Sequence, residues 1–224
     1  MLTTSFRGFT ISYFDQLEFE VITKDIFEKQ IYFFKSASAN PYILDCGANI
    51  GLATLFFKTL YPNSTIIGFE PNPETFKVYQ KNVIQNNLKN VTLTNAAVSD
   101  QVGQVDLYVG KKSTAWHSTN TLDQKLWDNE GDYTPITVRG VLLSNYIDQE
   151  VAMIKLDIEG AEGKVISEIK DKLNNVQNLT LEYHPNNGNS KYQIIKSLEM
   201  NHFSISSLQV NLNEEQILIK ATRS

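Results

Sequence analysis

The strongest constraint on the fold comes from residues 43–51, which read Ile-Leu-Asp-Cys-Gly-Ala-Asn-Ile-Gly, and from Glu70, nineteen positions after Gly51. The pattern indicates a buried strand, a turn bent at two glycines, a helix, and a second strand that ends in a carboxylate. Glycine has no Cβ, so the backbone of such a turn can pass close to a ligand, and the helix after it offers free N–H groups. A carboxylate about 20 positions on can accept both hydroxyls of a ribose. The chain is therefore predicted to bind a nucleoside-like cofactor.

The spacing of the glycines separates this turn from other nucleotide-binding turns. Gly47 and Gly51 form G-x-x-x-G, whereas a dinucleotide fingerprint reads G-x-G-x-x-G and a P-loop ends in G-K-[ST]. Asp45 lies two residues before Gly47, at the end of the expected strand. The combined D-x-G-x-x-x-G pattern is typical of the first motif of S-adenosylmethionine (SAM) methyltransferases, where the acidic residue can face the cationic methionine part of the cofactor. An ordinary strand–helix turn would not account for these residues occurring in register with Glu70.

Composition bounds the class of protein and its partners. The chain has 224 residues and a formal net charge of −5, with no run of Lys or Arg. The length fits one domain, and phosphate-tracking nucleic-acid binders are usually basic, so no nucleic-acid partner is expected. The sequence has no opening apolar leader and no long apolar run, so we expect no membrane span and a cytoplasmic location. Composition leaves the oligomeric state open.

Residues 1–40 are rich in aromatic side chains and are expected to form a cap segment ahead of a main domain at residues 41–224. Phe9, Ile11 and Tyr13 alternate along the sequence, which predicts a strand. The apolar spacing over residues 25–35 predicts a helix. The N-terminal addition is thus expected to be β-rich and helical.

From residue 41 the chain alternates predicted strands with predicted helices, which indicates an α/β fold with a mostly parallel sheet and helices on both faces. The predicted main strands are residues 42–46, 65–70, 91–98, 151–158 and 179–183, and the predicted helices are residues 50–60, 73–87, a segment from Ala161, and 192–200.

Three further segments complete the prediction. A short strand at residues 104–109 is expected to pair with residues 136–141, and residues 203–210 and 216–221 are expected to form a closing hairpin that places one antiparallel strand at the sheet edge. Residues 111–135 form a long polar connection, which is either a lid or a surface insertion.

Four motifs resemble the FkbM-type family of SAM-dependent methyltransferases, over roughly residues 42–205. They are residues 45–51, 68–73, 95–100 and 155–162; many methyltransferases share the first, and the last is more specific to this family. The resemblance implies a Rossmann-like class I methyltransferase fold, with a doubly wound, mostly parallel seven-stranded sheet. It also implies SAM as cofactor and O-methylation of a saccharide or another small natural product.

The resemblance allows the cofactor residues to be assigned. The turn residues would line the methionine and ribose, Glu70 would accept the ribose hydroxyls, and the end of the third strand would adjoin the adenine edge. Asn72 would lie near the adenosine or would instead cap the helix that starts at Pro73. The predicted cofactor residues are Asp45, Gly47, Asn49, Gly51, Glu70, Asn72, Asn95, Ala96 and Ala97.

Ionisable residues gather at the predicted carboxyl ends of the fourth and fifth strands, where ligands of open α/β sheets bind. Transfer of a methyl group to a hydroxyl needs a group that removes the hydroxyl proton, and histidine titrates near neutral pH. Lys155 is expected to pair with the neighbouring acids, and Glu162 to complement the dipole of the following helix. The predicted catalytic residues are Asp157, Glu159, Glu182 and His184.

A metal-assisted route remains open at the same strand ends. Asp157 and Glu182 could supply oxygen ligands to Mg²⁺, although nothing in the sequence requires the ion, and Cys/His spacings typical of metal sites are absent. The single cysteine, Cys46, is expected to be a small core residue.

Alternative functions are less consistent with the motifs. A nicotinamide-dependent oxidoreductase would carry the G-x-G-x-x-G turn, and a SAM-binding module without catalysis would lack the polar strand ends. Many N-methyltransferases carry [DN]-P-P-[YF] where this chain has Asp157, Ile158, Glu159 and Gly160. A hydroxyl acceptor, from a small molecule or a saccharide, is therefore the favoured prediction.

Overall fold

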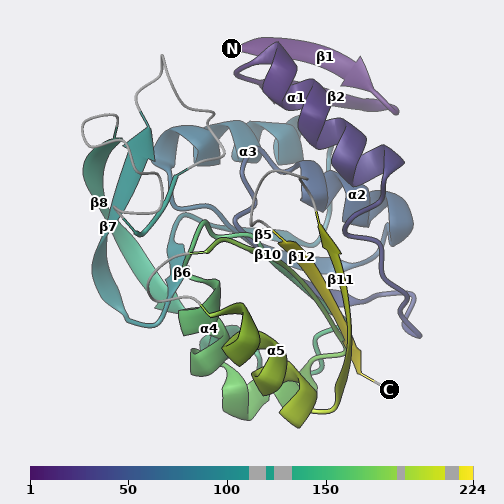
Figure 1. The fold of residues 1–224 in the computed structure, drawn as a ribbon. Helices are drawn as coiled ribbons and strands as arrows, with labels where there is room; N and C mark the ends of the chain where they lie inside the picture. Colours follow the sequence, from purple (N-terminus) through teal and green to yellow (C-terminus); the bar gives the residue numbers. More distant parts are fainter. Residues whose placement is uncertain (111–119, 124–132, 186–189, 210–216, 224) are drawn as a thin grey trace.

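The computed structural model describes residues 1–110, 120–123, 133–185, 190–209 and 217–223, and Figure 1 shows their arrangement. A seven-stranded sheet lies at the centre, in the order β11-β12-β10-β9-β3-β4-β5. The five strands from β10 to β5 are parallel to one another, which confirms the predicted doubly wound, mostly parallel sheet. Its strands are β3 (Tyr42–Cys46), β4 (Thr65–Phe69), β5 (Val91–Thr94), β9 (Met153–Leu156), β10 (Asn178–Tyr183), β11 (Phe203–Gln209) and β12 (Ile217–Arg223).

Helices cover both faces of the sheet, with α2 (Leu52–Leu60) and α3 (Pro73–Gln85) on one side and α4 (Glu162–Glu168) and α5 (Lys191–Met200) on the other (Figure 1). Neighbouring residues of a strand point to opposite faces. Accordingly, Ile43 packs into the core on the α2 side, while Leu44 packs into the core on the α4 side. A strand buried on both faces therefore reads as a continuous apolar run.

The closing hairpin differs from the prediction in its order. Strand β12 is antiparallel to both of its neighbours, β10 and β11, and lies between them. The expectation that the antiparallel strand forms the sheet edge is therefore wrong, because β11 occupies the edge and the chain returns inward to pair with β10.

The predicted third strand, residues 91–98, is interrupted at residues 95 and 96. Asn95 donates hydrogen bonds to the carbonyls of Glu70 and Pro71, at 2.8 and 3.0 Å, which turns the chain out of the main sheet. Residues 97–99 then belong to a second, three-stranded sheet in the order β6-β8-β7. Its strands are β6 (Ala97–Ser99), β7 (Gly103–Gly110) and β8 (Tyr133–Leu142), and the predicted pairing of β7 with β8 is confirmed.

The N-terminal segment begins with a hairpin of β1 (Leu2–Phe6) and β2 (Phe9–Tyr13), so the predicted strand is confirmed. The predicted helix at residues 25–35 is misplaced. Helix α1 (Gln16–Thr23) starts at the cap Asp15, and a π-helical turn (Lys24–Glu28) ends the helical stretch. Gln30 has a φ of 53°, which breaks the helix. A turn at residues 31 and 32 follows, and Tyr32 and Phe34 are buried in the core.

A buried side-chain amide on helix α3 binds the N-terminal hairpin. The side chain of Asn82, on α3, exchanges hydrogen bonds with the backbone of Ser12 at 2.8 and 3.0 Å, and it also donates to the carbonyl of Ile50 at 2.8 Å. Phe27 packs edge-on against Phe56 of α2, with ring centroids 5.5 Å apart. The hairpin and the start of α2 are thus held in one apolar cluster, while the proposed boundary at residue 41 stays a prediction.

Two 3-10 helices, Leu143–Tyr146 and Lys170–Asn175, complete the described elements. Among the described residues, no helix combines the length and apolar character that crossing a membrane would require. The predicted lid at residues 111–135 lies outside the described residues, apart from residues 120–123 and 133–135.

The glycine at the start of α2 leads to a stability prediction. Gly51 has a φ of +90°, and a Cβ there would lie 2.3 Å from the ring of Tyr79, whereas Gly8 has a φ of +85° with no atom within 4 Å of a Cβ. Gly8→Ala should cost about 1–2 kcal/mol of unfolding free energy from backbone strain. Gly51→Ala should cost a further 1–3 kcal/mol, roughly, because the ring must move. Urea unfolding of both variants measures the difference, and equal losses would contradict the packing argument.

Candidate functional site

A cavity of about 540 Å³ lies at the carboxyl ends of the central strands. Residues that follow β3, β4, β9 and β10 line it, as open α/β sheets predict. The N-terminal segment supplies another part of the wall, around the π-helical turn. Of the predicted site residues, those that line the cavity are Gly47, Asn49, Glu70, Ala96, Ala97, Asp157, Glu159, Glu182 and His184.

The other four predicted site residues, Asp45, Gly51, Asn72 and Asn95, are not among the lining residues. Asn72 caps α3 by accepting a hydrogen bond from the Glu74 amide at 2.9 Å, as the capping alternative expects. Gly51 contacts Tyr79, and the Asn95 amide holds the carbonyls that follow β4. Asn72, Gly51 and Asn95 thus make structural contacts and do not themselves line the cavity.

The turn after β3 packs directly on the end of β9. Gly47 has a φ of +76°, and a Cβ at this position would lie 1.8 Å from the carbonyl oxygen of Asp157. The amides of Gly47 and Ala48 both donate to the carbonyl of Phe69, at 3.0 and 2.8 Å. Only glycine allows this contact, which brings the turn, β4 and the β9 end to one edge of the cavity.

Glu70 holds the turn through its own carboxylate. Oε2 accepts a hydrogen bond from the Asn49 amide and Oε1 one from the Asn72 amide, each at 2.9 Å. The side chain is buried, and burial raises the pKa of Glu70 to about 7 although the two amides lower it. Each oxygen keeps a second lone pair for a ligand hydroxyl.

A buried ion-pair network lies under the turn. The Lys155 ammonium is 3.6 Å from Asp45 Oδ1 and 3.4 Å from Asp157 Oδ2, and it donates to the Gly47 carbonyl at 2.7 Å. Burial alone would lower the pKa of Lys155, but Asp157 and Asp45 raise it overall. Burial raises the pKa of Asp45 despite Lys155 and a 2.7 Å hydrogen bond from Thr54. The predicted pairing of Lys155 with these acids is confirmed.

His184 lies between two carboxylates just beyond β10. Its Nδ1 is 3.1 Å from Glu162 Oε1, and its Nε2 is 3.4 Å from Glu159 Oε2. Burial would lower the pKa of His184, but Glu159 and Glu162 raise it well above its usual value. Glu162 is fully buried and also accepts the Gly160 amide at 2.9 Å, so it does more than complement a helix dipole.

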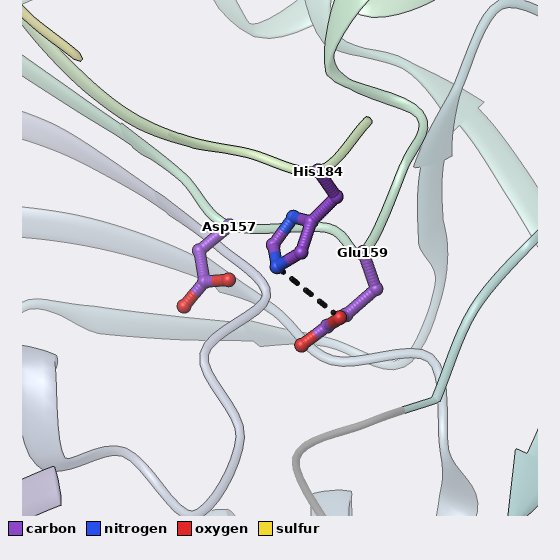
Figure 2. Close-up of side chains that lie close together, drawn as sticks. All are labelled: Asp157, Glu159 and His184. Atoms are coloured by element: carbon purple, nitrogen blue, oxygen red, sulfur yellow. Dashed lines mark ion pairs between the residues drawn. The ribbon is translucent and has the colours of Figure 1, made fainter. Parts of the chain in front are cut away.

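Figure 2 shows Asp157, Glu159 and His184 converging from the ends of β9 and β10. One ligand atom from each lies within 4.8 Å of the others, so these three residues could hold a metal ion. This set differs from the predicted pair of Asp157 and Glu182, because Glu159 has a φ of 55° and turns back toward the imidazole. Burial and Asp157 raise the pKa of the nearby Glu182 to about 7.

Sequence reasoning missed two residues of the site. Glu162 was assigned to the helix end, although its position three residues after Glu159 in one motif was an available signal. Tyr32 lines the cavity and donates a hydrogen bond to Asp157 Oδ2 at 3.2 Å. No sequence motif marks Tyr32, since it reaches the site only through the packing of the N-terminal segment.

Comparisons with known proteins identify the family of this chain. A family model described as the methyltransferase FkbM domain matches residues 45–215. The chain is 29% identical over 173 residues to "Methyltransferase 1" of Beauveria bassiana, with 70% of each chain covered. It is 23% identical over 193 residues to the "31-O-demethyl-FK506 methyltransferase FkbM" of Streptomyces tacrolimicus, with 74% of each chain covered.

A solved structure supports the fold. The chain is similar to the methyltransferase FkbM of Methylobacillus flagellatus, with a TM-score of 0.58 and 13% identity over 84% of this chain. This chain spans 45% of the length of that one. Since the family model covers more than half of the chain, the protein belongs to the FkbM-domain family of SAM-dependent methyltransferases.

Proposed function

We propose that this methyltransferase transfers the methyl group of SAM to a hydroxyl of a small-molecule acceptor, either a saccharide or another natural product. The observation that carries the proposal is one cavity that contains both the glycine turn with Glu70 and the acidic cluster at the ends of β9 and β10. A relative whose name specifies an O-demethyl substrate supports oxygen as the acceptor atom. The cytoplasmic location stays a prediction.

The residues around the turn fit SAM. The amide oxygen Oδ1 of Asn49 is buried without a hydrogen-bond partner among the described residues, which suits a polar group of the cofactor. Glu70 would accept the ribose hydroxyls, and Ala96 and Ala97 would leave room for the adenine edge. When bound, SAM supplies a methyl group on a positively charged sulfur.

The acidic cluster would prepare the acceptor. Both ring nitrogens of His184 lie near carboxylates, so the imidazole is held protonated and cannot readily accept a proton. Of the two predicted bases, Asp157 is therefore the stronger candidate for removing the hydroxyl proton. Glu159 and Glu182 would hold the acceptor hydroxyls or a cation.

A metal-assisted form of the reaction uses the same residues. Asp157 and Glu159, with Glu182, would supply oxygen ligands to a divalent cation such as Mg²⁺. His184 would join them only if the ion displaced its proton, because a metal binds the neutral imidazole. An ion there would lower the pKa of an acceptor hydroxyl. The two forms differ in their response to a chelator.

The cofactor site is tested by removing the Glu70 carboxylate. Glu70→Ala should weaken SAM binding by roughly 1.5–3 kcal/mol, because it removes a charge-assisted contact to the ribose. Glu74→Ala is the control, since Glu74 is exposed and is not a lining residue. Calorimetry with SAM measures both variants. Wild-type SAM affinity in Glu70→Ala would show that Glu70 does not contact the cofactor.

The pKa of Glu70 predicts how SAM affinity depends on pH. Only the ionised carboxylate can accept two hydroxyls, and burial raises its pKa to about 7. Affinity should therefore rise with pH up to about 7 and then level off, while below that value it falls by up to about tenfold per pH unit. Calorimetry of the wild type and of Glu70→Gln isolates this contribution. The same pH profile in both proteins would contradict it.

An acceptor is first identified by incubating the protein with labelled SAM and a panel of saccharides and small alcohols. The assignment of Asp157 as the base is then tested with that acceptor. Asp157→Asn should bind SAM with unchanged affinity, and its methyl-transfer rate should fall by about 10²- to 10⁴-fold, as expected when a general base is removed. His184→Ala should also slow turnover, because Glu159 then loses its ion-pair partner.

A chelator separates the two forms of the reaction. Loss of turnover that Mg²⁺ restores would support the metal-assisted form, and no effect would leave the acids in hydrogen-bonding roles. Full turnover in Asp157→Asn would contradict the base assignment.

A further inference from the structure

The N-terminal segment forms part of the cavity wall, although it lies outside residues 45–215, which the family model matches. Ile22, Ile26 and Ile31 supply apolar side chains to this wall, and Tyr32 supplies an aromatic one with a hydroxyl. Tyr32 is 3% exposed. This part of the cavity wall thus comes from residues outside the range that the family model matches.

Tyr32 is fixed by two contacts with the buried network. Its hydroxyl donates to Asp157 Oδ2 at 3.2 Å, and the Lys155 ammonium lies 5.3 Å from the centre of its ring. A cation at this distance from an aromatic ring is attracted to the ring face. The tyrosine therefore cannot rotate away without losing both contacts.

Both contacts on the Asp157 carboxylate fall on the same oxygen. Tyr32 and Lys155 each approach Oδ2, at 3.2 and 3.4 Å. Oδ1 is then left to face an acceptor in the cavity that Asp157 lines. The terminal torsion of aspartate is broad and has no strong intrinsic preference, so such anchors decide which oxygen faces the acceptor.

We propose that Tyr32 is a positioning residue for methyl transfer, whose hydroxyl holds Asp157 Oδ2 so that Oδ1 faces the acceptor hydroxyl. The inference rests on the proposed function, in which Asp157 removes the acceptor proton. Displacing a reacting group by about 1 Å can cost about 10²-fold in rate. The ring of Tyr32 lines the cavity, and its hydroxyl orients the Asp157 carboxylate.

The test is a double-mutant cycle with Tyr32→Phe, Asp157→Asn and the double variant. Methyl transfer is measured with labelled SAM and the acceptor that the panel identifies, and SAM affinity is measured by calorimetry. Tyr42→Phe is the matched control, because its hydroxyl donates at 3.0 Å to the Tyr146 carbonyl away from the cavity lining.

Tyr32→Phe should lower kcat by about 10- to 100-fold while the KM of the acceptor and the affinity for SAM stay within about twofold. Tyr42→Phe should keep its kcat. In the Asp157→Asn background, Tyr32→Phe should cause no further loss, because residues that act as one unit are not additive.

Four outcomes would overturn the proposal. A wild-type kcat in Tyr32→Phe, together with a reduced kcat in Asp157→Asn, would show that Tyr32 does not position Asp157 and would leave the proposed function intact. Losses that multiply in the double variant, or a loss of SAM affinity in Tyr32→Phe, would assign Tyr32 a role independent of Asp157. A wild-type kcat in Asp157→Asn would show that Asp157 is not the base. The proposed role of Tyr32 would then also be wrong.

Discussion

The site depends on one buried ammonium group, that of Lys155. It pairs with Asp45 beneath the turn and with Asp157 at the cavity, and it donates to the Gly47 carbonyl. A buried charge is tolerated only when it is paired and hydrogen-bonded, and the two acids and the Gly47 carbonyl are the partners of this ammonium. Lys155 thus connects the turn that would hold the cofactor to the acid that would act on the acceptor.

Carboxylates outnumber cations around this centre, and that imbalance sets the chemistry of the cavity. Burial raises the pKa of Glu70 and Glu182 to about 7, and burial also raises that of Glu159 although His184 opposes it. Perturbed ionisable groups in a cavity mark a functional site. In the proposed function, the positive sulfur of SAM and the acceptor hydroxyls would offset the repulsion among these acids.

Local patterns predicted much of the fold and many of the residues that line the cavity. The turn at Gly47 and the carboxylate of Glu70 follow from sequence spacing, because a strand–turn–helix unit is local. The break at Asn95, which sends the predicted third strand into a second sheet, depends on carbonyls 24 and 25 residues away. Tyr32 could not be placed because no motif marks it and its role arises from a tertiary contact with Asp157. Glu162 lies close to Glu159 in the sequence, but only the tertiary structure shows its contact with His184.

A crystal structure with S-adenosylhomocysteine bound would show whether the turn and the acidic cluster form one methyl-transfer site. We expect the Glu70 carboxylate to contact both ribose hydroxyls at about 3 Å and the sulfur to face Asp157 across the cavity. A nucleoside seated away from Glu70, or a sulfur that points away from Asp157, would contradict this expectation.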